Sequence, residues 1–242
     1  MSTPEILVLT RPAEAAGGET LPARVHPLPL LALATAPDTP ALRAALARAA
    51  AAAIQICLSA QAARALAERA PDFVQRCAAG VRWFAVGAAS AAALAQHLGV
   101  QAPCPEPGAR DSEGLLALLG PVHGVRVAIH TAPEGREWLA PALAERGADV
   151  VVVPVYTRVA RAPEAAELDL LAAARAPLLF SVTSVALLDR LLAVLPAMQR
   201  TPAETAIVVP AARIAAAALA AGFVDVRTAA SAAVPELLTQ LR

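Results

Sequence analysis

Short apolar runs alternate along this chain with longer amphipathic stretches. Runs of about four to eight residues rich in valine, leucine and isoleucine are typical of buried strands, whereas apolar residues spaced three or four apart are typical of helices. The runs expected to form strands are 6–9, 25–33, 54–58, 83–86, 125–130, 150–156, 178–181, 206–209 and 224–228. The stretches expected to form helices are 40–51, 60–70, 88–98, 112–119, 135–146, 164–174, 184–195, 211–221 and 232–241. This alternation predicts an α/β protein built on parallel sheets.

Three glycines mark where predicted helices end. Gly99, Gly147 and Gly222 each follow a helical stretch and precede a short apolar run. Glycine at this place commonly adopts the left-handed conformation that closes a helix. We therefore expect a helix end and a new strand at each of the three positions.

Two of the apolar runs carry internal prolines. One run is Val25–Leu33, with Pro27 and Pro29, and the other begins at Val150 and contains Pro154. A single open sheet has no need for two such long runs, but two small α/β domains joined by two chain segments would need them. The sequence therefore predicts two lobes with a ligand cleft between them.

Composition narrows the class of protein. The 242 residues are 57% hydrophobic, yet no apolar stretch of about 20 residues is free of charge and proline, so we expect no membrane span. The first residues carry no basic segment typical of a signal peptide. Cys57, Cys77 and Cys104 are odd in number and irregularly spaced, which favours neither a disulfide framework nor a zinc site. A cytoplasmic location is expected.

The chain contains no lysine, so its 20 basic residues are all arginine and balance 20 acidic residues. Without lysine, Schiff-base chemistry and a P-loop are excluded. A nucleic-acid-binding protein would show a cluster of basic residues, and the sequence shows none, so nucleic-acid binding is not expected. Any anionic ligand must be held by arginine, by hydroxyl groups or by backbone N–H groups.

Several hydroxyl residues lie where a predicted strand passes into a helix. They are Ser59, Ser90, Thr183 and Ser184. Serine and threonine at such places commonly cap helices. The same places, at the carboxyl ends of parallel strands, are where open α/β sheets bind ligands. The two interpretations are compatible, because one hydroxyl can cap a helix and also face a ligand.

A series of short motifs spans nearly the whole chain in a specific order. They occupy residues 8–12 (Val-Leu-Thr-Arg-Pro), 84–94, 111–116, 145–150, 155–158 (Val-Tyr-Thr-Arg) and 180–187, followed by Arg213 and the segment 221–223. In this order and spacing, the chain resembles the uroporphyrinogen-III synthase family of haem biosynthesis.

The resemblance implies two small doubly wound parallel-sheet lobes, similar to flavodoxin or Rossmann units. One lobe would comprise residues 1–34 and 161–242, and the other residues 35–160. A two-stranded linker would join them, near residues 29–37 and 154–163.

The resemblance also implies a cyclising hydro-lyase. Its substrate would be hydroxymethylbilane, which closes to uroporphyrinogen III with inversion of ring D and loss of water. No metal or organic cofactor would take part. The protein is expected to be a monomer without nucleic-acid or membrane partners, and a transient contact with the preceding pathway enzyme is consistent with this activity.

Site residues follow from the same resemblance. Tyr156, the only tyrosine, matches a proposed proton donor to the leaving hydroxyl. The residues that match substrate-binding positions are Arg11, Ser59, Ser90, Thr183, Ser184 and Arg213. The chain departs from the family pattern at Leu58-Ser59, at residues 131–137 and at residues 210–212. Two other hypotheses therefore stay open, a non-catalytic tetrapyrrole- or anion-binding protein on the same fold and a two-lobed small-molecule sensor.

Overall fold

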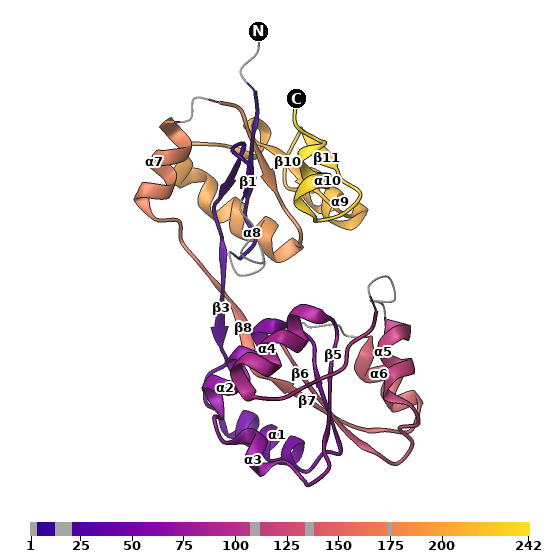
Figure 1. The fold of residues 1–242 in the computed structure, drawn as a ribbon. Coiled ribbons are helices and arrows are strands. Elements are labelled where there is room, and N and C mark those ends of the chain that lie inside the picture. The colour runs from indigo at the N-terminus through magenta and orange to yellow at the C-terminus, as the bar shows by residue number, and fades with distance from the viewer. Residues whose placement is uncertain (1–3, 13–20, 107–111, 134–137, 174–175) are drawn as a thin grey trace. The chain divides into compact units, whose positions relative to one another are not determined.

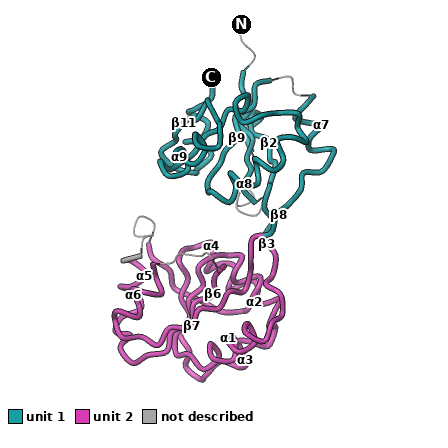
Figure 2. The backbone as a smooth tube through the Cα atoms, turned by 180° about the vertical axis from the view of Figure 1, so that it is seen from behind, with its two compact units in different colours: residues 1–32, 159–242 teal, residues 33–158 magenta. Residues whose placement is uncertain are grey.

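The computed structural model describes residues 4–12, 21–106, 112–133, 138–173 and 176–242. The chain divides into two compact units (Figure 2). Unit 1 comprises residues 1–32 and 159–242, and unit 2 comprises residues 33–158. Both chain ends therefore contribute to unit 1, whereas unit 2 is one continuous segment.

Unit 1 is built on a five-stranded parallel sheet in the order β11-β10-β9-β1-β2 (Figure 1). Its strands are β1 (Ile6–Leu9), β2 (Val25–Pro27), β9 (Leu178–Ser181), β10 (Ala206–Val209) and β11 (Val226–Thr228). Its helices are α7 (Ala165–Ala173), α8 (Val185–Val194), α9 (Ala212–Ala220) and α10 (Val234–Leu238), with 3₁₀ turns at Leu195–Met198 and Pro202–Glu204. Helices α7, α8 and α9 pack on one face, around Phe180, and α10 packs on the other, around Leu179.

Unit 2 is built on a four-stranded parallel sheet in the order β5-β4-β6-β7. Its strands are β4 (Ile54–Cys57), β5 (Arg82–Ala85), β6 (Arg126–Thr131) and β7 (Asp149–Pro154). Its helices are α1 (Pro40–Ala50), α2 (Ala60–Arg69), α3 (Phe73–Arg76), α4 (Ala88–Leu98), α5 (Ser112–Leu119) and α6 (Leu139–Glu145). Helices α1 to α4 contribute to the core on one face of the sheet, and α5 and α6 to the core on the other. The predicted fold class, with two doubly wound parallel sheets, is confirmed.

In both sheets the first strand lies between the second and the third. Strand β1 lies between β2 and β9, and β4 lies between β5 and β6. The chain therefore leaves the first strand on one side and returns on the other. In open α/β sheets this reversal point, beyond the carboxyl ends of the strands, is the usual ligand site.

The prediction of one continuous strand in each proline-bearing run is wrong. The first run forms β2, which ends at Pro27, and then β3 (Leu31–Thr35). The second forms β7, which ends at Pro154, and then β8 (Tyr156–Ala160). Proline has no N–H to donate to a ladder, so it is tolerated at the ends of edge strands such as β2 and β7 and interrupts the run there.

Strands β3 and β8 pair with each other in a separate two-stranded sheet. At one end the Arg161 N–H donates to the Leu30 carbonyl, and at the other the Ala36 N–H donates to the Val155 carbonyl. The residue number increases from 30 to 36 along one segment while that of its partner decreases from 161 to 155, so the two strands are antiparallel. These two strands connect unit 1 with unit 2.

Other element predictions differ from the structure mainly at their ends. Gly99, Gly147 and Gly222 have the expected positive φ, and a Cβ at Gly147 would meet the His123 ring at 2.5 Å. Helix α10 is shorter than predicted, and α3 and the two 3₁₀ turns were not predicted. Residues 135–137, the start of the helix expected over residues 135–146, lie outside the described residues.

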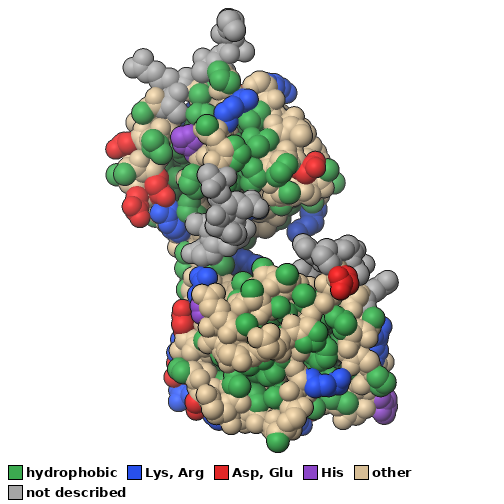
Figure 3. Space-filling view, viewed as in Figure 1, with side chains coloured by type: hydrophobic (Ala, Val, Ile, Leu, Met, Phe, Trp, Pro, Cys, Tyr) green, Lys and Arg blue, Asp and Glu red, His purple; other side chains and the backbone are tan. Residues whose placement is uncertain are grey.

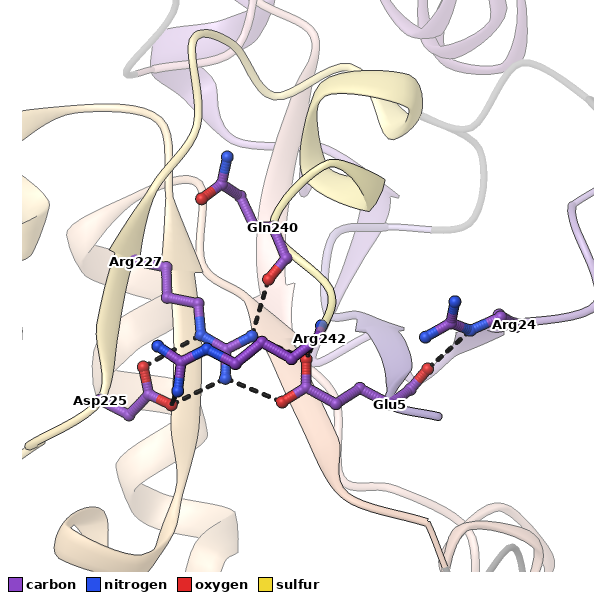
Figure 4. Close-up of polar contacts among 6 residues, drawn as sticks. All are labelled: Glu5, Arg24, Asp225, Arg227, Gln240 and Arg242. Carbon is purple, nitrogen blue, oxygen red and sulfur yellow. Dashed lines mark hydrogen bonds and ion pairs between the residues drawn. The ribbon is translucent and has the colours of Figure 1, made fainter. Parts of the chain in front are cut away.

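A cluster of charged side chains joins the two ends of the chain within unit 1 (Figure 4). Arg227, on β11, donates from Nη1 and Nη2 to the two carboxylate oxygens of Glu5, just before β1, at 2.7 and 2.8 Å. Arg227 also donates to Asp225 and to the Gln240 carbonyl, and the Arg242 N–H donates to Glu5. The Arg227 and Glu5 side chains are only 8% and 11% exposed. This pair therefore ties the first strand of unit 1 to its last.

Candidate functional site

The reversal point of unit 2 lies beyond the carboxyl end of β4. Ser59 follows this strand, has an extended backbone and forms the N-cap of α2. Its Oγ accepts the N–H of Ala62 at 3.1 Å, which satisfies one of the free donors of the first helical turn. The predicted capping role of Ser59 is confirmed.

Tyr156 lies against this cap. It is the first residue of β8, and its side chain lies in the core that contains α2, with the residue 6% exposed. Its hydroxyl oxygen is 3.3 Å from Ser59 Oγ. Ser59 Oγ accepts from Ala62 and donates to Tyr156, so this contact does not consume the phenol proton of Tyr156. The phenol remains able to donate to a ligand.

Ser90 lies in the first turn of α4, which follows the neighbouring strand β5. The residue is 4% exposed, and it does not cap the helix, because the N-cap is Gly87 with no side-chain hydrogen bond. The prediction of a hydroxyl at a strand–helix junction is therefore confirmed, but no side chain caps this helix. The amino end of α4 thus keeps uncapped N–H donors, which suit an anion.

The reversal point of unit 1 lies between the carboxyl ends of β1 and β9. Arg11 follows β1, is half-buried and donates from Nη1 to the Ala232 carbonyl at 3.2 Å. Its Nε is buried and has no hydrogen-bond partner among the described residues. Thr183 and Ser184 follow β9, and Ser184 caps α8 by accepting the Leu187 N–H at 3.2 Å.

Arg213 lies apart from this group in the fold of unit 1. It is exposed and belongs to the first turn of α9, which follows β10. Strand β10 lies one strand further from β1 than β9 does. Of the seven candidate residues, the structure brings only Ser59 and Tyr156 within hydrogen-bond distance of each other.

A second pair of hydroxyl residues supports the unit 1 reversal point, and the sequence analysis missed it. Thr10 Oγ1 donates to the Ser181 carbonyl at 2.5 Å, and the Thr10 N–H donates to Ser181 Oγ at 3.4 Å. Both residues are fully buried. They join the ends of β1 and β9 directly beside Arg11, and the signal that could have found them is a hydroxyl residue at the end of each strand.

His130, on β6, is fully buried within unit 2. Its Nε2 is 2.7 Å from Gln55 Oε1, and its ring stacks on Trp83 with centroids 5.9 Å apart. Gln55 donates its own N–H to the Ala49 carbonyl, so Nε2 of His130 carries the proton. Complete burial lowers the pKa of His130 to about 3, which keeps the ring neutral.

No group of three or more histidine, cysteine, aspartate or glutamate side chains suited to a metal ion occurs within the described part of the chain. The three cysteines are unpaired, and burial raises the pKa of Cys57 to about 12. None of the described helices is long and apolar enough to cross a membrane. On the face shown in Figure 3, basic and acidic side chains are dispersed rather than gathered into a patch of one sign.

Comparisons with known proteins agree on one family. The family model described as uroporphyrinogen-III synthase HemD matches residues 13–239. The fold is similar to that of uroporphyrinogen-III synthetase from Helicobacter pylori, with 15% identity, 97% of each chain covered and a TM-score of 0.62. The chain is also similar to uroporphyrinogen III synthase from Thermus thermophilus, with 18% identity over 92% of this chain and 91% of that one and a TM-score of 0.47. Because the family model covers nearly the whole sequence, this chain belongs to the uroporphyrinogen-III synthase family.

Proposed function

We propose that this chain is a cyclising hydro-lyase that converts hydroxymethylbilane to uroporphyrinogen III, with inversion of ring D and loss of water. The observation that carries this function is the family match over residues 13–239. The hydroxyl pair of Tyr156 and Ser59 at the reversal point of unit 2 is consistent with it. No cofactor is required, because the chemistry uses only proton transfer and positioning.

In the proposed reaction, the Tyr156 phenol donates its proton to the terminal hydroxyl of the substrate. The carbon–oxygen bond then breaks, water leaves, and the substrate carbon becomes a cation that ring D attacks. Ring D attacks through the carbon that already carries its methylene bridge, so the bond from that bridge to ring D then breaks and re-forms at the free α-carbon of ring D, which inverts the ring. The proton lost from that α-carbon returns to the Tyr156 phenolate. Ser59 would hold the phenol oxygen while leaving its proton free to transfer.

The remaining candidate residues are proposed to bind the eight carboxylates of the substrate. In unit 2, the Ser90 hydroxyl and the uncapped N–H groups of α4 suit a carboxylate. In unit 1, Arg11, Thr183, Ser184 and Arg213 offer two guanidinium groups and two hydroxyls near the carboxyl ends of β1, β9 and β10. Since the chain has no lysine, arginine supplies every side-chain cation except protonated histidine.

The protein is further proposed to act in the cytoplasm as a monomer, in transient contact with the enzyme that releases hydroxymethylbilane. This substrate closes spontaneously to the uninverted product, so a short path between the two enzymes would favour the inverted one. The main catalytic demand is to fold a reactive chain in one geometry, which is a task of positioning.

The test is a coupled assay in which the preceding enzyme generates hydroxymethylbilane and the oxidised products are separated as isomers. We expect type III to dominate when this protein is present and type I to dominate when it is omitted. Type I as the exclusive product with the purified protein would contradict the proposal.

A second candidate is a non-catalytic tetrapyrrole- or anion-binding protein. It is favoured by Leu58, which stands where the family pattern has a hydroxyl residue, and by Pro133, which removes one N–H from the segment after β6. Binding of uroporphyrin without formation of the type III isomer would support this candidate over the enzyme.

A further inference from the structure

Helix α2 contacts the segment around Tyr156 from both of its ends. At its amino end, the cap Ser59 meets the Tyr156 hydroxyl. At its carboxyl end, Arg69 is the last helical residue and donates from Nη2 to the backbone carbonyl of Ala36 at 2.5 Å. The second contact lies at the backbone of the linker, away from the phenol.

Ala36 is in turn hydrogen-bonded to Val155, the residue before Tyr156. The Ala36 N–H donates to the Val155 carbonyl at 2.9 Å, and the Val155 N–H donates to the Thr131 carbonyl at 3.0 Å. Both Ala36 and Val155 are buried. The start of β8 is therefore held between β6 on one side and the segment bound by Arg69 on the other.

Glu68, the residue before Arg69 in α2, makes a second hydrogen bond between this helix and the linker. The Thr35 hydroxyl donates to the carboxylate of Glu68, so two consecutive linker residues are bound by the last two residues of α2. A guanidinium group suits this place because it stays charged and its planar geometry directs the Nη2 donor at the Ala36 carbonyl, while Nε is buried without a hydrogen-bond partner among the described residues. Its charge also opposes the negative end of the helix dipole.

We propose that Arg69 is a positioning residue for Tyr156. By fixing Ala36, and through it Val155, Arg69 sets where the backbone of Tyr156 lies relative to α2, and this brings the phenol to Ser59. A shift of the backbone would move the phenol away from both Ser59 and its substrate atom. The inference rests on the proposed function only in that Tyr156 is taken as the proton donor.

The first test does not depend on activity. Because the chain contains one tyrosine, growth on 3-fluorotyrosine gives a protein with a single fluorine-labelled side chain. We expect Arg69→Met to shift or broaden the fluorine-19 resonance of Tyr156. The matched control is Arg64→Met, on the same helix, where Arg64 is exposed and has no hydrogen bond or ion pair in the described structure, and it should leave the resonance unchanged.

The second test is kinetic. Arg69→Met should lower kcat for type III product by roughly tenfold, with KM within about twofold, because a misplacement of about 1 Å can cost about 100-fold and a smaller shift costs less. Arg69→Lys keeps a cation with a less directed donor and should give intermediate values for both kcat and the resonance. If Arg69→Met does not fold, the comparison of Arg69→Lys with wild type still applies.

The outcomes separate this inference from the proposed function. If the wild-type protein makes no type III isomer, the function fails, but the fluorine resonance still tests the link between Arg69 and Tyr156. A resonance that is the same in wild type, Arg69→Met and Arg69→Lys would overturn the inference, even if activity fell. A shifted resonance with unchanged kcat would overturn it as well.

Discussion

At the scale of single residues, the central feature is the contact between Tyr156 and Ser59, which are 97 positions apart in the sequence. Each was predicted separately, the serine from a strand–helix junction and the tyrosine from a family motif. Their 3.3 Å contact could not be predicted, because it depends on where β8 begins beside α2. The contact explains how one hydroxyl both caps a helix and orients a phenol.

Tyr156→Phe tests this role, because it removes the hydroxyl and keeps the buried ring. We expect the rate of type III formation to fall by about 100-fold, as is typical for the loss of a general acid. The free energy of unfolding should fall by no more than about 1 kcal/mol, since one part-buried hydrogen bond is lost. The measurements are the coupled isomer assay and thermal unfolding, and wild-type activity in this variant would remove Tyr156 from the mechanism.

His130 shows that a conspicuous residue can be structural. Its ring is enclosed by Gln55, Trp83 and Phe73, none of which carries a charge. Protonation would place a charge in a fully buried site, so the folded protein favours the neutral ring. This preference links the stability of unit 2 to pH.

The sign of this link follows from the pKa of His130, which is about 3 in the folded state and near its usual value of 6.5 when unfolded. Below pH 6.5 the unfolded chain binds a proton that the folded chain does not, so stability falls as pH falls toward 3. Between pH 7 and pH 5 we expect a loss of about 2 kcal/mol in the free energy of unfolding. Urea unfolding followed by tryptophan fluorescence measures it.

The variant His130→Gln serves as the reference for this pH dependence. Whatever its stability at pH 7, its free energy of unfolding should lose far less between pH 7 and pH 5. The carboxylates of Glu5, Glu167 and Asp225, whose pKa values are lowered by arginine hydrogen bonds, lose their contribution only at more acidic pH. An equal decline in wild type and variant would contradict the assignment of the effect to His130.

At the scale of elements, periodicity was sufficient for most strands and helices. Strands β1, β9 and β10 and helices α4 and α5 have the predicted bounds, because clear turn or cap residues flank them. The prediction of one strand in each proline-bearing run is wrong, because periodicity cannot show that a run divides into two strands that belong to different sheets. Helix α3 was missed because its four residues are too few to carry a helical pattern.

The same limit applied to contacts between elements. Arg227 and Glu5 lie 222 positions apart, and nothing local to either residue predicts that they pair. Strand order does not predict the pair either, because β10 and β9 lie between β11 and β1 in the sheet. Removing one partner from such a buried pair leaves the other charge unpaired, which is strongly destabilising.

At the scale of the whole molecule, each hydrophobic core formed by the described residues belongs to one unit. The two clusters of unit 1 use only residues from its two segments, and the two clusters of unit 2 use only residues between Leu33 and Tyr156. Both tryptophans, Trp83 and Trp138, lie in unit 2. Tryptophan fluorescence therefore reports the unfolding of unit 2 alone, whereas far-ultraviolet circular dichroism reports both units.

Arg227→Met tests whether the units unfold separately. It should destabilise unit 1 by about 3 kcal/mol through the unpaired Glu5, lowering one transition in circular dichroism by roughly 10 °C or more. The midpoint measured by tryptophan fluorescence should stay at its wild-type value.

The control is Arg126→Met, which removes an exposed ion pair with Asp149 in unit 2 and should change little in either measurement. A fluorescence midpoint that fell together with the circular dichroism transition in Arg227→Met would show that the two units unfold as one.

By itself, the sequence determined the class of fold, the positions of most elements and the chemical types available at their ends, because periodicity, proline, glycine and the absence of lysine act locally. Only the tertiary structure decided which ends meet. The order of strands places β4 beside β6 and β1 beside β9. The start of β8 brings Tyr156 to Ser59, and the packing of the two chain ends within unit 1 brings Arg227 to Glu5. Such pairings depend on packing between residues far apart in the chain, and no local pattern encodes a distance of that kind.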